Sequence, residues 1–284
     1  MFGEPQARIE ESMSHPPGSG GAQNDPGTTP DGAATEALLA EGLRLYEQAE
    51  AAGASLRFIG SLAVQLTCPQ WRHLATDLGR RRSIDIDFVG YSKEQNRLTA
   101  VFTEAGFQIH PSVRHSQEYG VKRLIFEPPG HHPKVDVFLD DLIMAHTVSF
   151  AGRLGMSAPT VSLVDLLLSK LQIHEMTRND LVDLVILLTE HEVGRAGAAI
   201  DGDHVGRVMG RDWGFFYTAS TNLAALESAL EGFAQLPNES ATRVRTQIER
   251  LRRILAESPK SSRWKMRARV GTRVRWYEEV SEVT

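Results

Sequence analysis

The chain has 284 residues, a hydrophobic share of 41% and a net charge of −5, values that are ordinary for a soluble protein. A single cysteine, Cys68, excludes an internal disulfide, and no apolar run approaches the ~20 residues of a membrane span. The N-terminus lacks a charged start followed by an apolar core. We therefore expect no signal peptide, no membrane partner and a cytoplasmic protein.

The chain begins with a polar leader and then alternates helices with strands. Residues 1–34 are rich in Gly, Pro and Ser, which predicts a disordered leader. A helix is predicted from Thr35. A short strand over 56–60 then leads into a helix capped by Ser61. Residues 69–82 are polar and basic, which predicts an inserted loop or irregular helix.

The alternation continues to residue 158 and predicts an α+β protein with a small mixed sheet. The predicted elements are a strand over 83–90, a helix over 92–105 that begins with a capping box of Ser92 and Gln95 and is closed by Gly106, and strands over 121–126 and 135–139.

Helices dominate after Pro159. Ser162 with Asp165 and Thr177 with Asp180 predict two helix starts, and a helix containing Trp213, Phe215 and Phe216 and another over 238–256 follow. We therefore divide the chain into a leader (1–34), an α/β core (35–158), a helical region (159–237) and a helix with a basic C-terminal segment (238–284).

Asp85 and Asp87 are the most informative residues of the α/β core. Side chains of a strand alternate between its faces, so the two carboxylates share one face. Neighbouring carboxylates repel each other and are tolerated best around a cation such as Mg²⁺, which is normally shared with substrate phosphates. The alternative is an ordinary solvated strand face.

Two further features complete a possible site. Asp136 lies on a later strand, opposite the apolar Val135 and Val137. Upstream, Gly60 and Ser61 enter a helix, where free backbone N–H groups suit a phosphate. Each has a plain structural alternative, namely a half-buried strand for Asp136 and a simple strand-to-helix turn for the Gly-Ser pair.

Taken together, this order of elements resembles the nucleotidyltransferases of the DNA polymerase beta superfamily. The run Leu166–Leu171 and the run Arg178–Leu184 further resemble the helical half of the abortive-infection type IV toxin nucleotidyltransferases. The resemblance covers about residues 56–190. The gap from Ser61 to Asp85 is longer than is usual in that family, with residues 69–82 as the insert.

The resemblance implies roles for these residues. Asp85, Asp87 and Asp136 would hold two Mg²⁺ ions, or Mn²⁺, which bridge the triphosphate of an NTP such as ATP. Asp136 would also deprotonate the attacking hydroxyl. The residues that would bind the nucleotide are Gly60, Ser61, Lys170, Asp180 and Asp183, and Lys170 would act in catalysis as well.

The helical residues keep structural alternatives. Lys170 sits at the edge of an apolar stripe, where it either contacts a phosphate or snorkels to water. Asp180 could serve only as the N3 residue of its helix cap. Asp183 lies on the same side and could support Lys170. His131 and His132 are interpreted as solvated residues of a loop tip, because no suitable third ligand is near.

The C-terminal segment is strongly basic. From Arg243 onward there are twelve Lys or Arg residues against five Glu. Trp264, Trp276 and Tyr277 lie among these cations, a pattern typical of a nucleic-acid surface. The alternative is a tail that packs on the acidic body.

The favoured function is transfer of a nucleoside monophosphate from an NTP to an acceptor with release of pyrophosphate. The acceptor is an RNA 3′ end, a protein or a small molecule, and the related toxins suggest an antitoxin protein as a partner. The alternative is a non-catalytic nucleotide- or nucleic-acid-binding protein that retains the fold and contacts RNA through its basic C-terminal segment.

Overall fold

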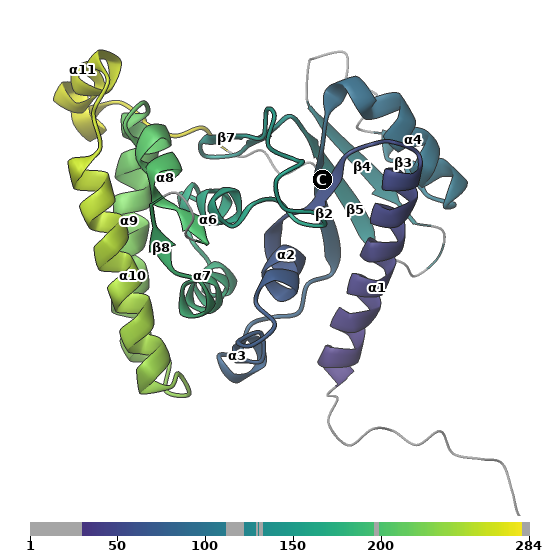
Figure 1. Ribbon diagram of the computed structural model, residues 1–284, viewed down its shortest axis with the longest axis horizontal. Helices are drawn as coiled ribbons and strands as arrows, with labels where there is room; N and C mark the ends of the chain where they lie inside the picture. Colours follow the sequence, from purple (N-terminus) through teal and green to yellow (C-terminus); the bar gives the residue numbers. More distant parts are fainter. Residues whose placement is uncertain (1–29, 112–121, 129, 131–132, 196–198, 280–284) are drawn as a thin grey trace, which may run out of the picture.

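The computed structural model describes residues 30–111, 122–128, 130, 133–195 and 199–279. In this part of the chain a mixed sheet with its covering helices forms one lobe, and the helices that follow form a second lobe beside it (Figure 1). The predicted α+β class with a small mixed sheet is confirmed. None of the described helices is long and apolar enough to cross a membrane.

The sheet has the strand order β1-β2-β5-β4-β3. Strands β2 and β5 run parallel, and every other neighbouring pair is antiparallel. The strands are β1 (Leu56–Phe58), β2 (Asp85–Gly90), β3 (Gln108–Ile109), β4 (Arg123–Glu127) and β5 (Lys134–Leu139).

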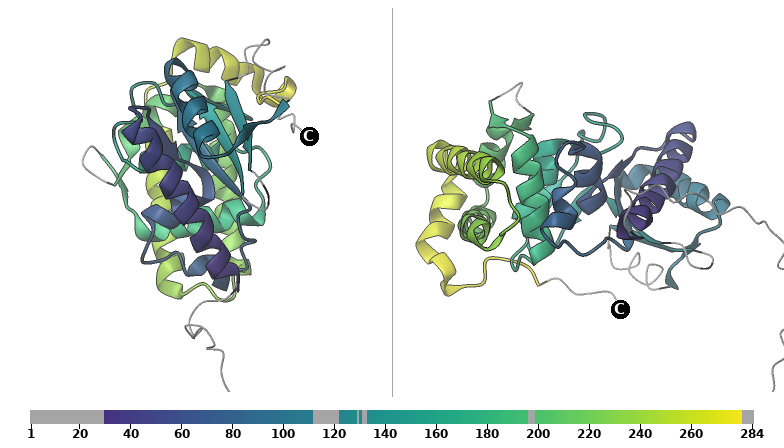
Figure 2. Two further views of the ribbon diagram at one scale, coloured as in Figure 1. Left: turned by 90° about the vertical axis from the view of Figure 1, so that its right-hand side faces the viewer. Right: turned by 90° about the horizontal axis from the view of Figure 1, so that it is seen from below.

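One face of the sheet is covered by α1 (Pro30–Ala51) and α4 (Gln95–Glu104), as Figure 2 shows. Ile86 and Phe88 of β2 are fully buried on this face. Helix α1 comes so close that a Cβ added at Gly42 would meet the Phe58 ring and Ile86. Because strand side chains alternate, Asp85 and Asp87 lie on the opposite face, toward α2 (Gly60–Thr67).

The second lobe is a helical bundle. It contains α6 (Leu163–Leu171), α7 (Arg178–Glu190), α8 (Gly202–Met209), α9 (Trp213–Ala229) and α10 (Asn238–Glu257), and it ends with α11 (Ser262–Val270), which packs on α9. Ser162 accepts a hydrogen bond from the Asp165 amide, and Thr177 with Asp180 forms a capping box. Both predicted helix starts are confirmed.

The two lobes are joined by backbone hydrogen bonds at the predicted boundary. The amide of Phe58 in β1 donates to the Pro159 carbonyl at 2.9 Å, and the Val161 amide donates to the Phe58 carbonyl at 3.0 Å. Helix α2 also packs against both α6 and α7. The open face of β2 therefore lies next to the helices of the second lobe.

Three other helix starts differ from the prediction. Ile59, with extended backbone, is the N-cap of α2, so Ser61 lies inside the first turn instead of capping it. The capping box of Ser92 and Gln95 does not form, because a 3₁₀ turn over Ser92–Glu94 precedes α4. Helix α1 begins at Pro30, so residues 30–34 are helical, with proline at a position that suits it. The rest of the predicted leader lies outside the described residues.

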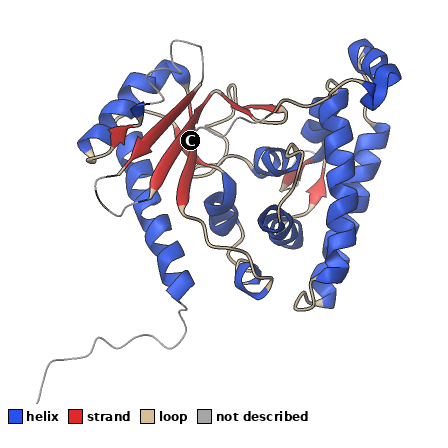
Figure 3. Cartoon of the chain, turned by 180° about the vertical axis from the view of Figure 1, so that it is seen from behind, coloured by secondary structure: helices blue, strands red, loops and turns tan. Residues whose placement is uncertain are grey.

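The prediction also omitted several short elements (Figure 3). Strands of two or three residues have no measurable hydrophobic period, so a sequence pattern cannot reveal them. Strand β2 begins at Asp85, two residues after the predicted start at residue 83, and the preceding Ile84 is 66% exposed. The omitted strands are β3, β6 (Asp141–Ile143), β7 (Thr147–Ser149), β8 (Val193–Gly194) and β9 (Ile200–Asp201). The helices α8 and α11 were omitted as well, and the insert over 69–82 contains α3 (Leu74–Asp77) between turns.

Candidate active site

Three aspartates share the open face of the sheet. Asp87 of β2 lies directly beside Asp136 of β5 in the parallel register, and Asp85 lies beside Lys134. Residues paired in register point to the same side of a sheet. The sequence predicted the alternation within each strand, and the structure adds that the two strands are neighbours. Asp136 is therefore on the same side as Asp85 and Asp87.

The Gly60–Ser61 turn lies against this acidic face. Gly60 has a φ of +71°, and a Cβ at this position would lie 2.8 Å from Oδ2 of Asp87. The Ile59 amide donates to the Asp87 carbonyl at 3.0 Å, which fixes the turn to β2. Only glycine combines this backbone conformation with room for the carboxylate. The long insert between Ser61 and Asp85 thus leaves the turn and the strand in contact.

Burial and neighbouring negative charge raise the pKa of Asp85 and of Asp87. Burial, followed by the charges of Asp136 and Asp85, raises the pKa of Asp87 to about 6. Burial, followed by the charge of Asp136, also raises the pKa of Asp85. Carboxylates close together in a poorly solvated place disfavour their charged forms, and a bound cation relieves that repulsion. The electrostatics of the face therefore favour a cation.

Asp136 is held by a cation from the protein. It is 4% exposed, and Nη2 of Arg123 on β4 lies 2.8 Å from its Oδ2, with the Lys134 ammonium at 3.9 Å. The other oxygen, Oδ1, is buried without a hydrogen-bond partner, and so is Nε of Arg123. A buried polar atom without a partner is rare in folded proteins. Both atoms retain the capacity to bind a ligand.

Among the described residues, no three His, Cys, Asp or Glu side chains are arranged to hold one metal ion together. The donor types nevertheless suit Mg²⁺, which is usually bound by one or two carboxylates together with substrate phosphates and water. Asp85 and Asp87 supply such a pair, and Asp136, whose Oδ1 has no hydrogen-bond partner in the described part of the chain, is the register neighbour of Asp87 on the adjacent strand. The residues present therefore fit a metal that is completed by a phosphate-bearing substrate.

Lys170 of α6 is buried in an ion network. Its ammonium lies 3.0 Å from Oδ1 of Asp180 and 2.7 Å from Oδ2 of Asp183. Burial acts to lower the pKa of Lys170, but the two carboxylates outweigh it and leave the pKa raised. Its positive charge partly opposes the rise in the pKa of Asp87, so Lys170 lies within electrostatic range of the acidic face. Lys170 is 8% exposed and does not snorkel to bulk water.

Asp180 and Asp183 have distinct contacts. Oδ2 of Asp180 accepts hydrogen bonds from the amide and hydroxyl of Thr177, as a helix cap requires, while Oδ1 pairs with Lys170. Asp183 is fully buried and supports Lys170, as expected. Both carboxylates are engaged within the protein. Their direct contact with a nucleotide stays a prediction.

Arg80 is a site residue that the sequence interpretation missed. Its Nε lies 2.6 Å from Oδ1 of Asp183, and its Nη1 donates to the Ser83 hydroxyl at 3.3 Å. The Ser83 hydroxyl in turn contacts the hydroxyl of Ser61. The insert over 69–82 therefore connects the Gly60–Ser61 turn with the Lys170 network. The basic run at 80–82, directly before the acidic strand, is the signal that could have identified it.

The aromatic residues of the C-terminal segment pack on the helical lobe. Nε1 of Trp276 donates to the Thr218 hydroxyl at 3.1 Å, and the Tyr277 ring stacks on His174 with centroids 3.6 Å apart. The Glu278 amide donates to the Ala145 carbonyl at 3.0 Å. For these rings the packing alternative is correct, since a ring stacked within the protein is not a free platform for a base. His131 and His132 lie outside the described residues.

Comparison with known proteins gives one structural similarity. No protein-family model and no curated protein matches the chain. The solution structure of the antibiotic-resistance factor ANT(2'')-Ia is similar with a TM-score of 0.34 and 13% identity, over 55% of this chain and 84% of that one.

Proposed function

We propose that the chain is a metal-dependent nucleotidyltransferase that moves a nucleoside monophosphate from an NTP to an acceptor hydroxyl. The observation that carries the proposal is the position of Asp87, which lies beside Asp136 in the sheet and against Gly60 of the helix-starting turn. This contact brings acidic oxygens and backbone N–H groups to one place. A metal-bound triphosphate needs both.

In the proposed reaction, the acceptor oxygen attacks the α-phosphorus of the NTP. The bond from the α-phosphorus to the oxygen that bridges it to the β-phosphorus breaks, and pyrophosphate leaves. Asp85, Asp87 and Asp136 would hold Mg²⁺, which neutralises charge on the reacting phosphates when bound. The unpaired Oδ1 of Asp136 is the oxygen best suited to take the acceptor proton, because its other oxygen pairs with Arg123.

The remaining residues bind and orient the nucleotide in this proposal. Gly60 and Ser61 present the first turn of α2 to the terminal phosphates. Lys170 supplies positive charge from the helical lobe, and its position is fixed by Asp180 and Asp183. Arg80 holds the same network from the insert. The acceptor is an RNA 3′ end in our proposal, and a toxin paired with an antitoxin is the biological role that fits such chemistry.

The test is nucleotide transfer by the full-length protein. It is incubated with each α-labelled NTP, Mg²⁺ and either cellular RNA or cellular protein, and labelled acceptor and released pyrophosphate are measured. Asp87→Asn should abolish both signals, whereas the control Asp77→Asn, at an exposed position of α3, should leave them unchanged. Absence of transfer with every NTP and divalent ion, or equal activity of the two variants, would overturn the proposal.

A further inference from the structure

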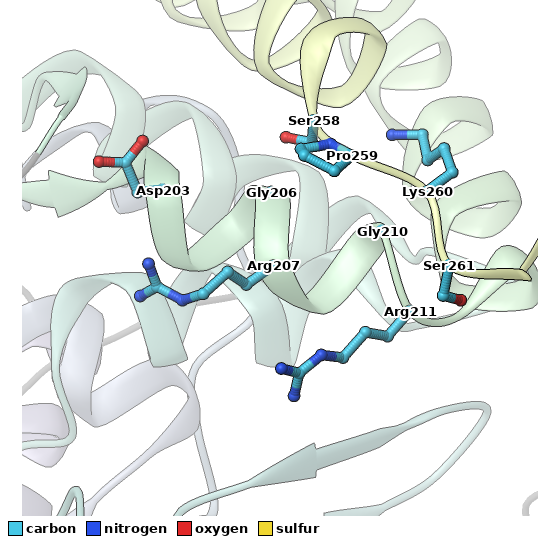
Figure 4. Close-up of a pocket in the computed structure, with 9 residues that line it drawn as sticks. All are labelled: Asp203, Gly206, Arg207, Gly210, Arg211, Ser258, Pro259, Lys260 and Ser261. Atoms are coloured by element: carbon cyan, nitrogen blue, oxygen red, sulfur yellow. The ribbon is translucent and has the colours of Figure 1, made fainter.

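A cavity of about 530 Å³ lies on the helical lobe, away from the acidic strands. It is formed between α8 and the linker from α10 to α11 (Figure 4), and no residue that lines it belongs to the sheet. The lining residues are Asp203, Gly206, Arg207, Gly210, Arg211, Ser258, Pro259, Lys260 and Ser261. This cavity is separate from the candidate active site.

Glycines along α8 allow the linker to approach closely. Gly206 and Gly210 lie one helical turn apart, and a Cβ at either position would overlap Ser258 or the Pro259 carbonyl. The Ser261 amide donates to the Gly210 carbonyl at 2.9 Å and fixes the linker in place. The backbones of α8 and of the linker therefore form the floor of the cavity, and the hydrogen bond fixes their relative position.

Arg207 of α8 and Arg211, in the turn that follows this helix, both line the cavity (Figure 4). The two side chains therefore bring positive charge to the same cavity. Among the described residues, the partners of the Arg207 side chain are distant: Oδ2 of Asp201 at 3.6 Å and Nδ1 of His204 at 3.5 Å. The exposed Arg211 side chain has no hydrogen bond or ion pair with any described residue. Its guanidinium is free to bind an anion.

A second cavity of about 500 Å³ adjoins the first and shares Arg211 with it. It adds Arg263, whose side chain also lacks a partner among the described residues, and Trp264, whose buried Nε1 has no acceptor. Asp212 lines it too, but Oδ1 of Asp212 accepts the Phe215 amide as a helix cap. Of the described residues that line the two cavities, the free carboxylate acceptors are Asp203 and Oδ2 of Asp212. The unpaired N–H groups of Arg211, Arg263 and Trp264 outnumber them.

We propose that the two cavities form a phosphate-binding site centred on Arg211. Guanidinium groups bind phosphate through paired N–H donors, and phosphate oxygens would provide the acceptors that Arg211 and Arg263 lack. The phosphate belongs either to a small phosphorylated molecule or to the backbone of an RNA strand. The proposal is independent of the nucleotidyltransferase function, because it uses neither the acidic face nor a metal.

The experiment measures binding by the full-length protein in the presence of EDTA. Pyrophosphate is titrated by calorimetry, and a fluorescently labelled single-stranded RNA of twelve nucleotides is titrated by anisotropy at several salt concentrations. The variants are Arg211→Gln and the matched control Arg245→Gln, an exposed arginine of α10 that lines neither cavity. Both positions are exposed, so both variants should fold.

We expect Arg211→Gln to weaken binding about tenfold or more, as loss of a charged hydrogen bond does, and Arg245→Gln to leave it unchanged. Binding of pyrophosphate identifies a small-molecule phosphate site. Binding of RNA alone, with a salt slope lowered by about 0.7 in Arg211→Gln, identifies the RNA backbone. The proposal is overturned if neither probe binds or if both variants weaken binding equally.

Discussion

Nη2 of Arg123 on β4 lies 2.8 Å from Oδ2 of Asp136 on β5. Nε of Arg123 and Oδ1 of Asp136 are both buried and have no hydrogen-bond partner among the described residues. A buried ion pair contributes net stability only when its remaining polar atoms are also satisfied. Here a cation at Oδ1 and an anion at Nε would complete both residues. The pair therefore has the donor and the acceptor that a metal-bound phosphate would use.

Replacement of Arg123 tests this interpretation. In Arg123→Gln, Asp136 stays buried without its main partner, so we expect a loss of about 3 kcal/mol in the free energy of unfolding without metal. Mg²⁺ with a non-hydrolysable NTP should recover more stability in the variant than in the wild type, because the ligand then supplies the missing positive charge. Urea denaturation with and without the ligands measures both effects.

The control for Arg123 is Lys122→Gln, which removes a cation that pairs on the surface with Asp141. Exposed pairs of this kind contribute little to stability, because water and salt screen them. Equal ligand stabilisation of Arg123→Gln and the wild type would show that Arg123 does not compete for the site.

The raised pKa of Asp87 makes stability depend on pH. The folded protein holds this proton up to about pH 6, whereas the unfolded chain loses it near the ordinary aspartate value of 3.8. Between these values the folded state binds more protons, so the contribution of Asp87 to stability falls as pH rises through this window, by about 3 kcal/mol at most.

We therefore expect Asp87→Asn to be more stable than the wild type at pH 7.5, with the difference vanishing near pH 4. Thermal and urea denaturation across this range measure it, with Asp77→Asn as the control. A variant that is less stable than the wild type at pH 7.5 would show that the charge on Asp87 is already compensated within the protein.

A comparison of substitutions at Gly60 and Gly152 distinguishes the effect of backbone strain from the effect of displacing Asp87. Gly60 and Gly152 have nearly equal φ values, +71° and +69°, but a Cβ at Gly152 would meet nothing within 4 Å, whereas one at Gly60 would meet Asp87. We expect each Gly→Ala change to cost about 1–2 kcal/mol in stability. Only Gly60→Ala should also lower nucleotide transfer, by about 10²-fold, because it displaces Asp87. Equal transfer rates in the two variants would contradict this.

Substitution of Arg80 tests whether the insert over 69–82 stabilises the Lys170 network. Asp183 is fully buried between Arg80 and Lys170, so removal of either cation leaves its charge poorly compensated. We expect Arg80→Ala to destabilise the protein by about 3 kcal/mol in urea denaturation. Arg82→Ala, at an exposed position of the same basic run, should change stability by less than about 0.5 kcal/mol. Similar losses in both would place Arg80 outside the network.

Local chemistry was predictable from the sequence. Because side chains alternate along a strand, the sequence alone showed that Asp85 and Asp87 share one face. The capping box at Thr177 was predicted from the four consecutive residues that form it. The start of α2 was predicted incorrectly because Ser61 is a good capping residue by type. The positive φ of Gly60 instead moves the cap to Ile59.

Long-range pairing was not predictable in the same way. The contact of Asp87 with Asp136 depends on which strands become neighbours, and the sequence does not state that order. Arg80 and Arg123 were missed because each pairs with a residue distant in the sequence. The basic run at 80–82 points to Arg80 without indicating its partner, and no local pattern distinguishes Arg123 from a surface arginine. The packing of Trp276 on Thr218 likewise required the tertiary structure.

The most direct test of the central claim is to locate the metal. The protein is crystallised with Mn²⁺ and a non-hydrolysable NTP analogue, and the anomalous signal of manganese identifies the ion. The account predicts a peak about 2.1 Å from carboxylate oxygens of Asp85 and Asp87, with the triphosphate against Gly60 and Asp136 close by. A nucleotide bound elsewhere on the chain, with no ion at these carboxylates, would contradict it.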